Sequence, residues 1–157
     1  MDFIIRNAVL SDRIKIRPLQ KEIAELHYAG RPDLFKTEAR YFTDESFAER
    51  LNSPEHFVFI ADINGEAAGY AFANINKIRG HSTYIDFNSF YIDDICVLKK
   101  YRRMGIGSAL FKVCLETAKI NNCYNIDLGV WSFNQEAIAF YERVGMRERN
   151  KRMELII

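Results

Sequence analysis

The amino-acid sequence predicts a mixed α/β fold of the α+β kind, with helices on both faces of a mostly antiparallel mixed sheet. Two features lead to this expectation. Asn64-Gly65 separates two apolar runs with strand-like periodicity, which is typical of a β-hairpin with a type I′ turn. Later in the chain, a buried strand, a glycine-rich turn, an amphipathic helix and another buried strand follow one another, which is typical of a crossover unit.

The first third of the chain is expected to hold one short strand and several short helices. Residues 3–6 form the strand, and a helical pattern runs from about residue 11 to residue 29. Pro18 interrupts that pattern. Because an interior proline loses a hydrogen bond and clashes with the preceding turn, we expect a kink or two short helices there. A further helix is predicted from residue 43 or 44 to Leu51, ended by Asn52-Ser53-Pro54.

The rest of the chain alternates between strand and helix periodicity. The predicted strands are residues 57–63, 66–73, 89–98, 124–130 and 152–157. The predicted helices are residues 105–122 and 134–144, with Gly145 as the residue that ends the second of them.

Length and composition limit the class of protein. The 157 residues suit a single domain, residues 1–157, and the net charge of +1 lacks the basic excess of a dedicated nucleic-acid binder. No apolar run approaches the roughly 18 residues that span a bilayer, and the first residues lack a signal-peptide pattern. Cys96, Cys114 and Cys123 are odd in number, have no CxxC spacing and lie in apolar segments, as reduced core thiols do. We expect a cytoplasmic protein without nucleic-acid or membrane partners.

The turn before the helix at residues 105–122 is the segment most indicative of function. Its helix start offers amides without intrahelical partners, glycines that allow close approach, and the cations of Arg102 and Arg103, so it could hold a diphosphate. A Gly-x-Gly at a helix start is about as often a packing device. A Walker loop is excluded because no lysine follows Gly107, and a dinucleotide fingerprint is excluded because Leu110 stands where a third Gly or Ala is needed.

The pattern formed by Arg102, Gly105 and Gly107 resembles the acyl-CoA pyrophosphate loop of the GNAT superfamily of N-acyltransferases. Residues 91–97 are similar to the fourth strand of that family, and residues 134–146 are similar to its late helix and turn. The resemblance extends over the whole chain and departs at Arg103, where the family often has glycine. It implies a GNAT-like fold and an N-acetyltransferase with acetyl-CoA as co-substrate.

The reaction that the resemblance implies is direct attack of a primary amine on the thioester in a ternary complex. An aliphatic ammonium with a pKa near 10.4 must lose a proton first. The family pattern favours Asp93 as the base, and Asp94, expected on the opposite face of the strand, is interpreted as structural. Asp93 could instead bind a loop amide or orient a cationic substrate. Tyr141 matches a tyrosine that protonates the departing thiolate in family members, with a core aromatic as the alternative.

The resemblance also implies a set of cofactor contacts. The backbone of residues 95–97 would pair with the amide arm of the cofactor as an added strand does, and a main-chain N–H would polarise the thioester oxygen. The strand at residues 124–130 would part from the preceding strand to leave a slot. Asn134 would contact the cofactor, cap the late helix, or do both. The expected cofactor-binding residues are Ile95, Cys96, Val97, Arg102, Arg103, Met104, Gly105, Ile106, Gly107, Ser108, Asn134 and Tyr141.

Acceptor binding is expected in the first half of the chain. His27 and Phe35 lie in a stretch that resembles a subset of GNAT sequences, and Trp131 follows a buried strand, so each could bind the acceptor or simply pack. The histidines are too scattered for a metal motif, so no metal is expected. We expect a small-molecule amine acceptor and consider a homodimer possible. The alternatives are a protein N-terminal or lysine acetyltransferase, and a non-catalytic acyl-CoA-binding module.

Overall fold

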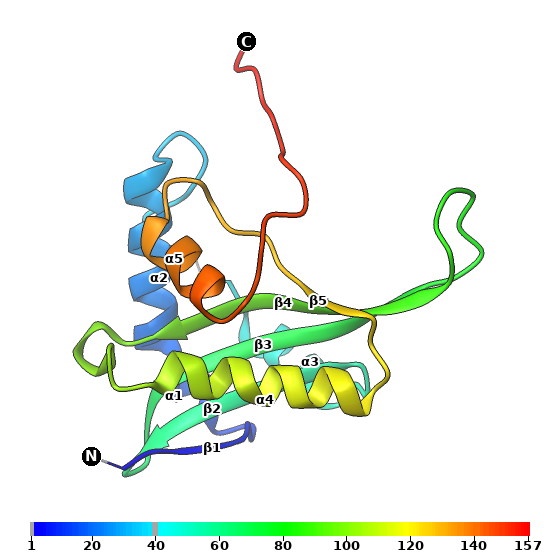
Figure 1. Ribbon diagram of the computed structural model, residues 1–157. Helices are drawn as coiled ribbons and strands as arrows, with labels where there is room; N and C mark the ends of the chain where they lie inside the picture. The colour runs from blue at the N-terminus through cyan, green and yellow to red at the C-terminus, as the bar shows by residue number, and fades with distance from the viewer. Residues whose placement is uncertain (1, 39–40) are drawn as a thin grey trace.

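A single five-stranded sheet organises the computed structural model, which describes residues 2–38 and 41–157. The strand order is β1-β2-β3-β4-β5 (Figure 1). Neighbouring strands pair antiparallel except β4 and β5, which are parallel. The strands are β1 (Ile4–Asn7), β2 (His56–Ile63), β3 (Glu66–Ile78), β4 (Phe87–Val97) and β5 (Asn125–Asp127). The predicted fold class is confirmed.

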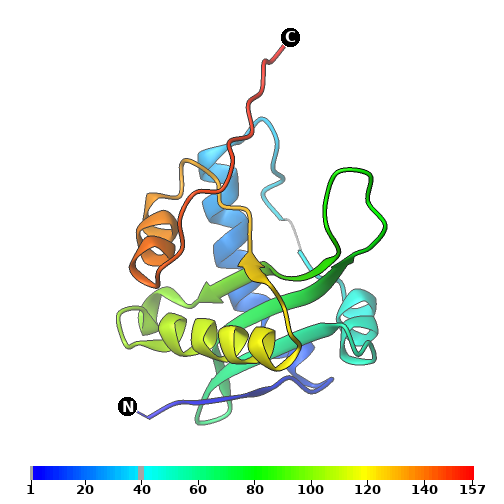
Figure 2. The same cartoon turned by 45° about the vertical axis from the view of Figure 1, so that its right-hand side comes forward.

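Helices cover both faces of this sheet (Figure 2). One face carries α4 (Ile106–Ile120), and the opposite face carries α1 (Asp12–Lys15), α2 (Arg17–Gly30) and α3 (Asp44–Leu51). The last helix, α5 (Gln135–Arg143), packs against α4 through Phe140 and Phe111, whose ring centroids are 6.4 Å apart. Among the described residues, every helix falls short of the length and apolar character that a membrane crossing needs.

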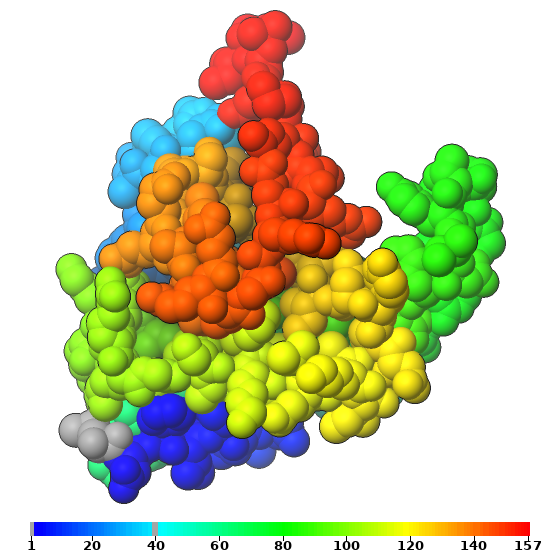
Figure 3. Space-filling model, in the orientation of Figure 1, coloured from blue at the N-terminus to red at the C-terminus, as the bar shows by residue number. Residues whose placement is uncertain are grey.

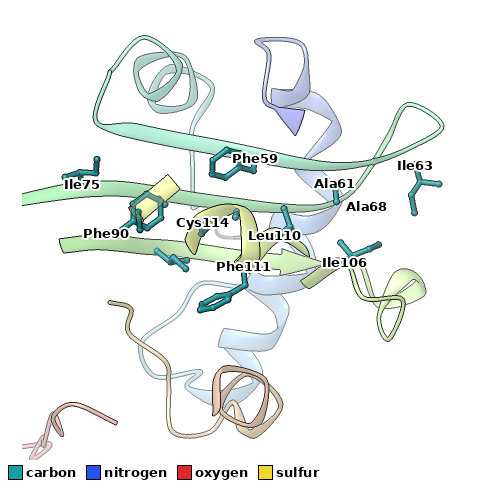
Figure 4. Close-up of a cluster of buried hydrophobic side chains, with 14 residues drawn as sticks. Phe59, Ala61, Ile63, Ala68, Ile75, Phe90, Ile106, Leu110, Phe111 and Cys114 are labelled. Atoms are coloured by element: carbon teal, nitrogen blue, oxygen red, sulfur yellow. The ribbon is translucent and has the colours of Figure 1, made fainter. Parts of the chain in front are cut away.

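Each face of the sheet has its own hydrophobic core, because alternate strand residues point to opposite faces. The core under α4 is built from strand and helix side chains that include Phe59, Phe90, Leu110, Phe111 and Cys114 (Figure 4). The core under α1, α2 and α3 includes Leu19, Phe47, Ile60, Tyr70 and Phe72. Helices and apolar side chains therefore cover both faces of the sheet.

Two local features confirm the sequence predictions. Asn64 and Gly65 both have positive φ, 52° and 86°, as the two central residues of a type I′ turn require. Pro18 occupies the first turn of α2, where its missing N–H costs no hydrogen bond, so the chain forms two helices as expected.

Two predicted strands differ from the structure. The strand expected at residues 124–130 is reduced to the three residues of β5, and residues 152–157 form no strand. Alternating apolar residues do not form a strand without a hydrogen-bonding neighbour, and residues 147–157 run away from the sheet (Figure 1). Met153 and Leu155 are 85% and 87% exposed, and Glu154 is held by an ion pair with Arg31. The terminal segment and the loop between β3 and β4 both stand away from the body of the molecule (Figure 3).

Candidate active site

The glycine turn places a helix N-terminus at the end of β4. Gly105, with φ of +83°, precedes α4 in the left-handed conformation that glycine adopts most readily. The amide of Ala109 makes the first intrahelical bond, to the Gly105 carbonyl, so the amides of Ile106, Gly107 and Ser108 precede the hydrogen-bonded turn. A Cβ on Gly107 would lie 3.4 Å from the Phe140 ring, so this position also lets α5 approach α4 closely. The turn serves packing and offers amides at the same time.

Arg102 is the basic residue of the turn that faces the end of β4. Its Nε donates to the Val97 carbonyl at 3.2 Å, and its Nη1 lies 3.3 Å from Glu136 of α5. Its Nη2 lies 3.8 Å from Glu22 of α2. Lys100 pairs instead with Glu66 of the β2–β3 hairpin at 2.6 Å. Arg102 therefore spans β4, α2 and α5 at the mouth of the glycine turn.

One edge of β4 opens halfway along the strand. The pairing with β5 covers only Ser89 to Tyr91 of β4, which face Asn125 to Asp127. Beyond that point β5 is followed by residues 128–134, which lead to α5. This segment separates from β4, as expected (Figure 1). Asn134 begins α5 as its N-cap, because its side chain accepts the Ala137 amide at 3.1 Å. The open stretch of β4 thus runs from residue 92 to the glycine turn.

A β-bulge in this open stretch changes where the two aspartates point. Ala73 of β3 is paired with Ile92 and Phe72 with Asp94, so Asp93 is the extra residue. The bulge shifts the alternation by one, and both carboxylates reach partners on the face covered by α2 and α3. The expectation that one aspartate points to each face was therefore wrong, because alternation holds only in an unbulged strand.

Asp93 is held in an ion pair. Its Oδ2 accepts a hydrogen bond from Arg50 Nη1 of α3 at 2.8 Å. The Arg50 guanidinium in turn lies over the Phe42 ring, 4.9 Å from its centroid. Side-chain exposure of Arg50 and Asp93 is 19% and 23%, so solvent screens this pair less than a fully exposed one.

Asp94 sits in a less polar environment. Its Oδ2 accepts a hydrogen bond from the hydroxyl of Tyr70 at 2.5 Å. Burial raises the pKa of Asp94 to about 6, and the charge of Asp93 acts in the same direction, while hydrogen bonds from Tyr70 and the Ile95 amide oppose the rise. The same environment raises the pKa of the Tyr70 hydroxyl well above its usual value.

Tyr141 lies on α5 and comes within electrostatic reach of the same carboxylate. Burial raises the pKa of Tyr141, and the charge of Asp94 raises it further. The phenol is therefore protonated at any physiological pH and available as a hydrogen-bond donor. Asp94 and Tyr141 come from β4 and α5, the two elements that flank the open edge.

An aromatic cluster lies at the C-terminal end of α2. The rings of His27 and Phe35 are 4.9 Å apart, and those of Phe35 and Trp131 are 5.3 Å apart. Phe133 stacks on Trp131 at 5.8 Å and packs so tightly on α2 that a Cβ at Gly30 would come within 2.5 Å of its ring. The three predicted acceptor residues are thus brought together by segments about 100 residues apart in sequence.

Tyr41 links this cluster to Asp94. Its hydroxyl contacts Nδ1 of His27, and the charge of Asp94, together with burial, raises its pKa to about 12. Burial lowers the pKa of His27, which favours the neutral imidazole. Within residues 2–38 and 41–157, no three His, Cys, Asp or Glu side chains are grouped as a metal site requires.

Sequence reasoning missed Arg50, Tyr70, Tyr41 and Phe133. Tyr70 lies 24 positions from Asp94, and Arg50 lies 43 positions from Asp93. Only the order of the strands and the placement of α3 bring these pairs together. The Asp93-Asp94 doublet itself was visible, but the bulge that decides its orientation leaves no mark in hydrophobic periodicity.

The fold and the glycine turn define an acyl-CoA-dependent acyltransferase. Residues 21–146 match the model of the Acetyltransferase (GNAT) family, and the chain belongs to that family. It is an acetyl-CoA-dependent N-acetyltransferase.

Relatives named for different activities resemble this chain to similar degrees. An N-alpha-acetyltransferase of Sulfurisphaera tokodaii is 28% identical over 160 residues, covering 94% of this chain and 81% of the relative. A thialysine N-epsilon-acetyltransferase of Sus scrofa is 29% identical over 149 residues, covering 92% and 84%.

Solved structures share the fold over nearly the full chain. A crystal structure of a mutant BH1408 protein of Bacillus halodurans superimposes with a TM-score of 0.93, at 27% identity and over 98% of this chain and 99% of that one. An aminoglycoside N-acetyltransferase in complex with CoA has a TM-score of 0.71 at 18% identity, over 98% of each chain, and shares the fold.

Proposed function

We propose that the protein transfers the acetyl group of acetyl-CoA to a primary amine of a small molecule, by direct attack in a ternary complex. The observation that carries this proposal is the convergence at the open edge of β4. Two carboxylates lie on the stretch of β4 that leads to a glycine turn and a helix N-terminus, and the charge of Asp94 acts on a protonated tyrosine of α5. A cluster of aromatic rings at the C-terminal end of α2 is linked to this stretch through Tyr41. Carboxylates suit an ammonium ion, and the helix N-terminus suits a diphosphate.

The state of the thiols supports direct transfer. A covalent acetyl-enzyme needs an activated nucleophile, and for cysteine this is the thiolate. Burial raises the pKa of Cys96 and, to about 12, that of Cys114. Burial also raises the pKa of Cys123. All three thiols are therefore poor nucleophiles at neutral pH, and the amine itself is the best attacking group.

The cofactor contacts of this proposal follow the site geometry. The amides at the start of α4 and the Arg102 guanidinium receive the diphosphate. The backbone of residues 95–97, on the open edge of β4, pairs with the amide arm of acetyl-CoA. Arg103, Met104 and Asn134 are proposed as further contacts. Tyr141 donates a proton to the departing sulfur. The buried environment that raises the pKa of Tyr141 also raises the proton affinity of the thiolate. One of the two adjacent carboxylates, Asp93 or Asp94, accepts the amine proton.

The aromatic cluster supports a small acceptor. His27, Phe35 and Trp131 contact one another from two distant segments, and Phe133 closes them against α2. This arrangement offers an apolar wall of limited size with the Tyr41 hydroxyl at its inner end. A second candidate acceptor is a peptide N-terminus, which is favoured by the likeness to the archaeal N-alpha-acetyltransferase.

Thiol release from acetyl-CoA tests the proposal. The panel contains spermidine, phenethylamine, lysine, kanamycin and a tetrapeptide with a free N-terminus, and acetyl-CoA affinity is measured in parallel by calorimetry. We expect turnover with at least one small amine. Turnover with the peptide alone would contradict the small-molecule acceptor and indicate a protein N-terminal acetyltransferase. Cofactor binding with no turnover would favour a non-catalytic acyl-CoA-binding module.

A further inference from the structure

We propose that Asp94, and not Asp93, takes the proton from the acceptor ammonium in the reaction in which Tyr141 gives a proton to the leaving sulfur. This inference rests on the proposed function, because it concerns the amine that attacks in that reaction. It assigns the base to the carboxylate that the sequence pattern marks as structural.

Asp93 is less available to an arriving ammonium ion because it already pairs with a cation. Its carboxylate accepts a charge-assisted hydrogen bond from Arg50 at 2.8 Å. The Arg50 guanidinium also lies over the Phe42 ring, so it contacts the ring as well as the carboxylate. Protonation of Asp93 would also leave Arg50 without its counter-charge.

Asp94 is surrounded by groups that are neutral or negative. Tyr70 of β3 donates to it, and the hydroxyls of Tyr41, before α3, and of Tyr141, on α5, lie close enough for its charge to act on them. Asp93 and Cys96 are the titratable groups that act on it or respond to it within β4. An arriving ammonium ion is therefore the cation that compensates the charge of Asp94.

The proton affinity of Asp94 suits a general base near neutral pH. Burial, and then the charge of Asp93, raise its pKa to about 6. A base is most effective when its pKa lies near the working pH, because it is then ionised yet holds a proton well. The hydrogen bond from Tyr70 fixes the carboxylate and keeps its pKa from rising further.

The base and the acid are electrostatically coupled. The negative charge of Asp94 is one of the causes that raise the pKa of Tyr141, so protonation of Asp94 makes Tyr141 a better acid. An N–H bond of the ammonium breaks, and its proton goes to Asp94. The nitrogen lone pair then bonds to the thioester carbon, and the C–S bond breaks. Tyr141 gives its proton to sulfur and regains one from the new amide nitrogen, and Asp94 returns its proton to solvent.

The pH dependence of three variants tests this assignment. kcat/KM is measured from pH 5 to pH 9 with acetyl-CoA and the panel amine that turns over fastest. Asp94→Asn, whose amide oxygen still accepts from Tyr70, should lower kcat/KM at pH 8 by roughly 10² to 10⁴ and abolish the acid limb. Tyr70→Phe removes a hydrogen bond that lowers the pKa of Asp94, so the acid limb should move to higher pH. Asp93→Asn removes a like charge, so the limb should move to lower pH.

Acetyl-CoA affinity and the unfolding midpoint are recorded for every variant, so that loss of fold is separated from loss of the base. If Asp94→Asn does not fold, the acid limbs of Tyr70→Phe and Asp93→Asn still identify the base. Their opposite shifts in pH are not expected if the base is Asp93 held by Arg50. Turnover that survives Asp94→Asn, or an acid limb that Tyr70→Phe leaves in place, overturns this inference alone. Absence of turnover with every amine overturns it together with the proposed function.

Discussion

At the scale of single residues, the buried carboxylate of Asp12 shows how charge stabilises this fold. Asp12 is fully buried and accepts hydrogen bonds from both terminal nitrogens of Arg6, at 2.7 and 2.9 Å, and from the Val9 amide. Arg6 also donates to Asp62, which accepts the Gly65 amide of the β2–β3 turn. This network joins β1, α1 and the first hairpin.

The pKa of Asp12 predicts a loss of stability in acid. Burial alone would raise this pKa, but the hydrogen bonds from Arg6 and Val9 outweigh burial and lower it below its usual value. A lowered folded-state pKa gives stability that is present above the unfolded-state pKa, about 3.9, and lost as the pH falls through the folded-state value.

Urea unfolding from pH 3 to pH 7 measures this contribution. Wild type should lose stability below about pH 4, and Asp12→Asn should lose about 3 kcal/mol at pH 7 because Arg6 then keeps Asp62 as its only carboxylate partner. The variant should also have the shallower acid dependence. If the unfolding free energy of the two proteins depends equally on pH, Asp12 has the same pKa in the folded and unfolded states, which contradicts this prediction.

Tyr141 is the residue whose hydroxyl is predicted to act in the chemical step only. Tyr141→Phe keeps the ring packing on α5 and removes the proton donor, so kcat should fall by roughly 10²-fold while acetyl-CoA affinity stays the same. Stopped-flow thiol release and calorimetry separate the two quantities. A wild-type kcat would remove Tyr141 from the mechanism.

Arg102 is predicted to act in binding rather than in chemistry. Arg102→Glu replaces the cation between β4 and α5 with an anion, so acetyl-CoA affinity should fall at least tenfold. The control Lys112→Glu makes the same charge change on the exposed part of α4, and its affinity should match wild type. Equal affinities of the Arg102 variant and the control would contradict the diphosphate assignment.

At the scale of elements, the hydrophobic periodicity of the sequence predicts well where strands and helices lie. It predicts poorly which elements they pair with or pack against. The boundaries of α3, α4 and α5 fall within two residues of expectation, because caps and glycines mark them. The Gly145 turn is typical: its amide and that of Met146 bond to carbonyls of α5, as in a Schellman motif. The bulge at Asp93 and the short β5 depend on neighbouring strands, so no local pattern reveals them.

Gly105 is the element boundary on which the cofactor turn depends. Its φ of +83° is strained for any side chain, although a Cβ there would meet no atom within 4 Å. Gly105→Ala should therefore cost about 1 kcal/mol of unfolding free energy through backbone strain alone, and should weaken acetyl-CoA binding by redirecting the amides of α4. Thermal unfolding and calorimetry give both values.

Gly129→Ala is the matched control for that substitution. Gly129 lacks a positive φ, and a Cβ there would be 3.7 Å from the Tyr91 hydroxyl, which is ordinary contact. Its stability should stay within about 0.5 kcal/mol of wild type. A Gly105→Ala variant no less stable than this control would show that the turn tolerates a side chain.

At the scale of the whole molecule, the candidate site lies at the open edge of β4, between the glycine turn and α5. The sequence pattern was sufficient to predict the glycine turn and the late helix with its cap, whereas the acceptor role of the aromatic residues stays a prediction. It could not predict the ion pair of Arg50 with Asp93 or the hydrogen bond of Tyr70 to Asp94. It also could not predict that the charge of Asp94 acts on Tyr41 and Tyr141, because that depends on how α5 and the segment before α3 are placed on the sheet.

The claim that the amine attacks acetyl-CoA directly is tested most directly by initial-velocity kinetics with both substrates varied, together with the intact mass of the protein after incubation with acetyl-CoA alone. Direct attack in a ternary complex predicts intersecting lines in double-reciprocal plots and an unmodified protein. Parallel lines with an acetylated protein, the signature of a covalent intermediate, would contradict the account.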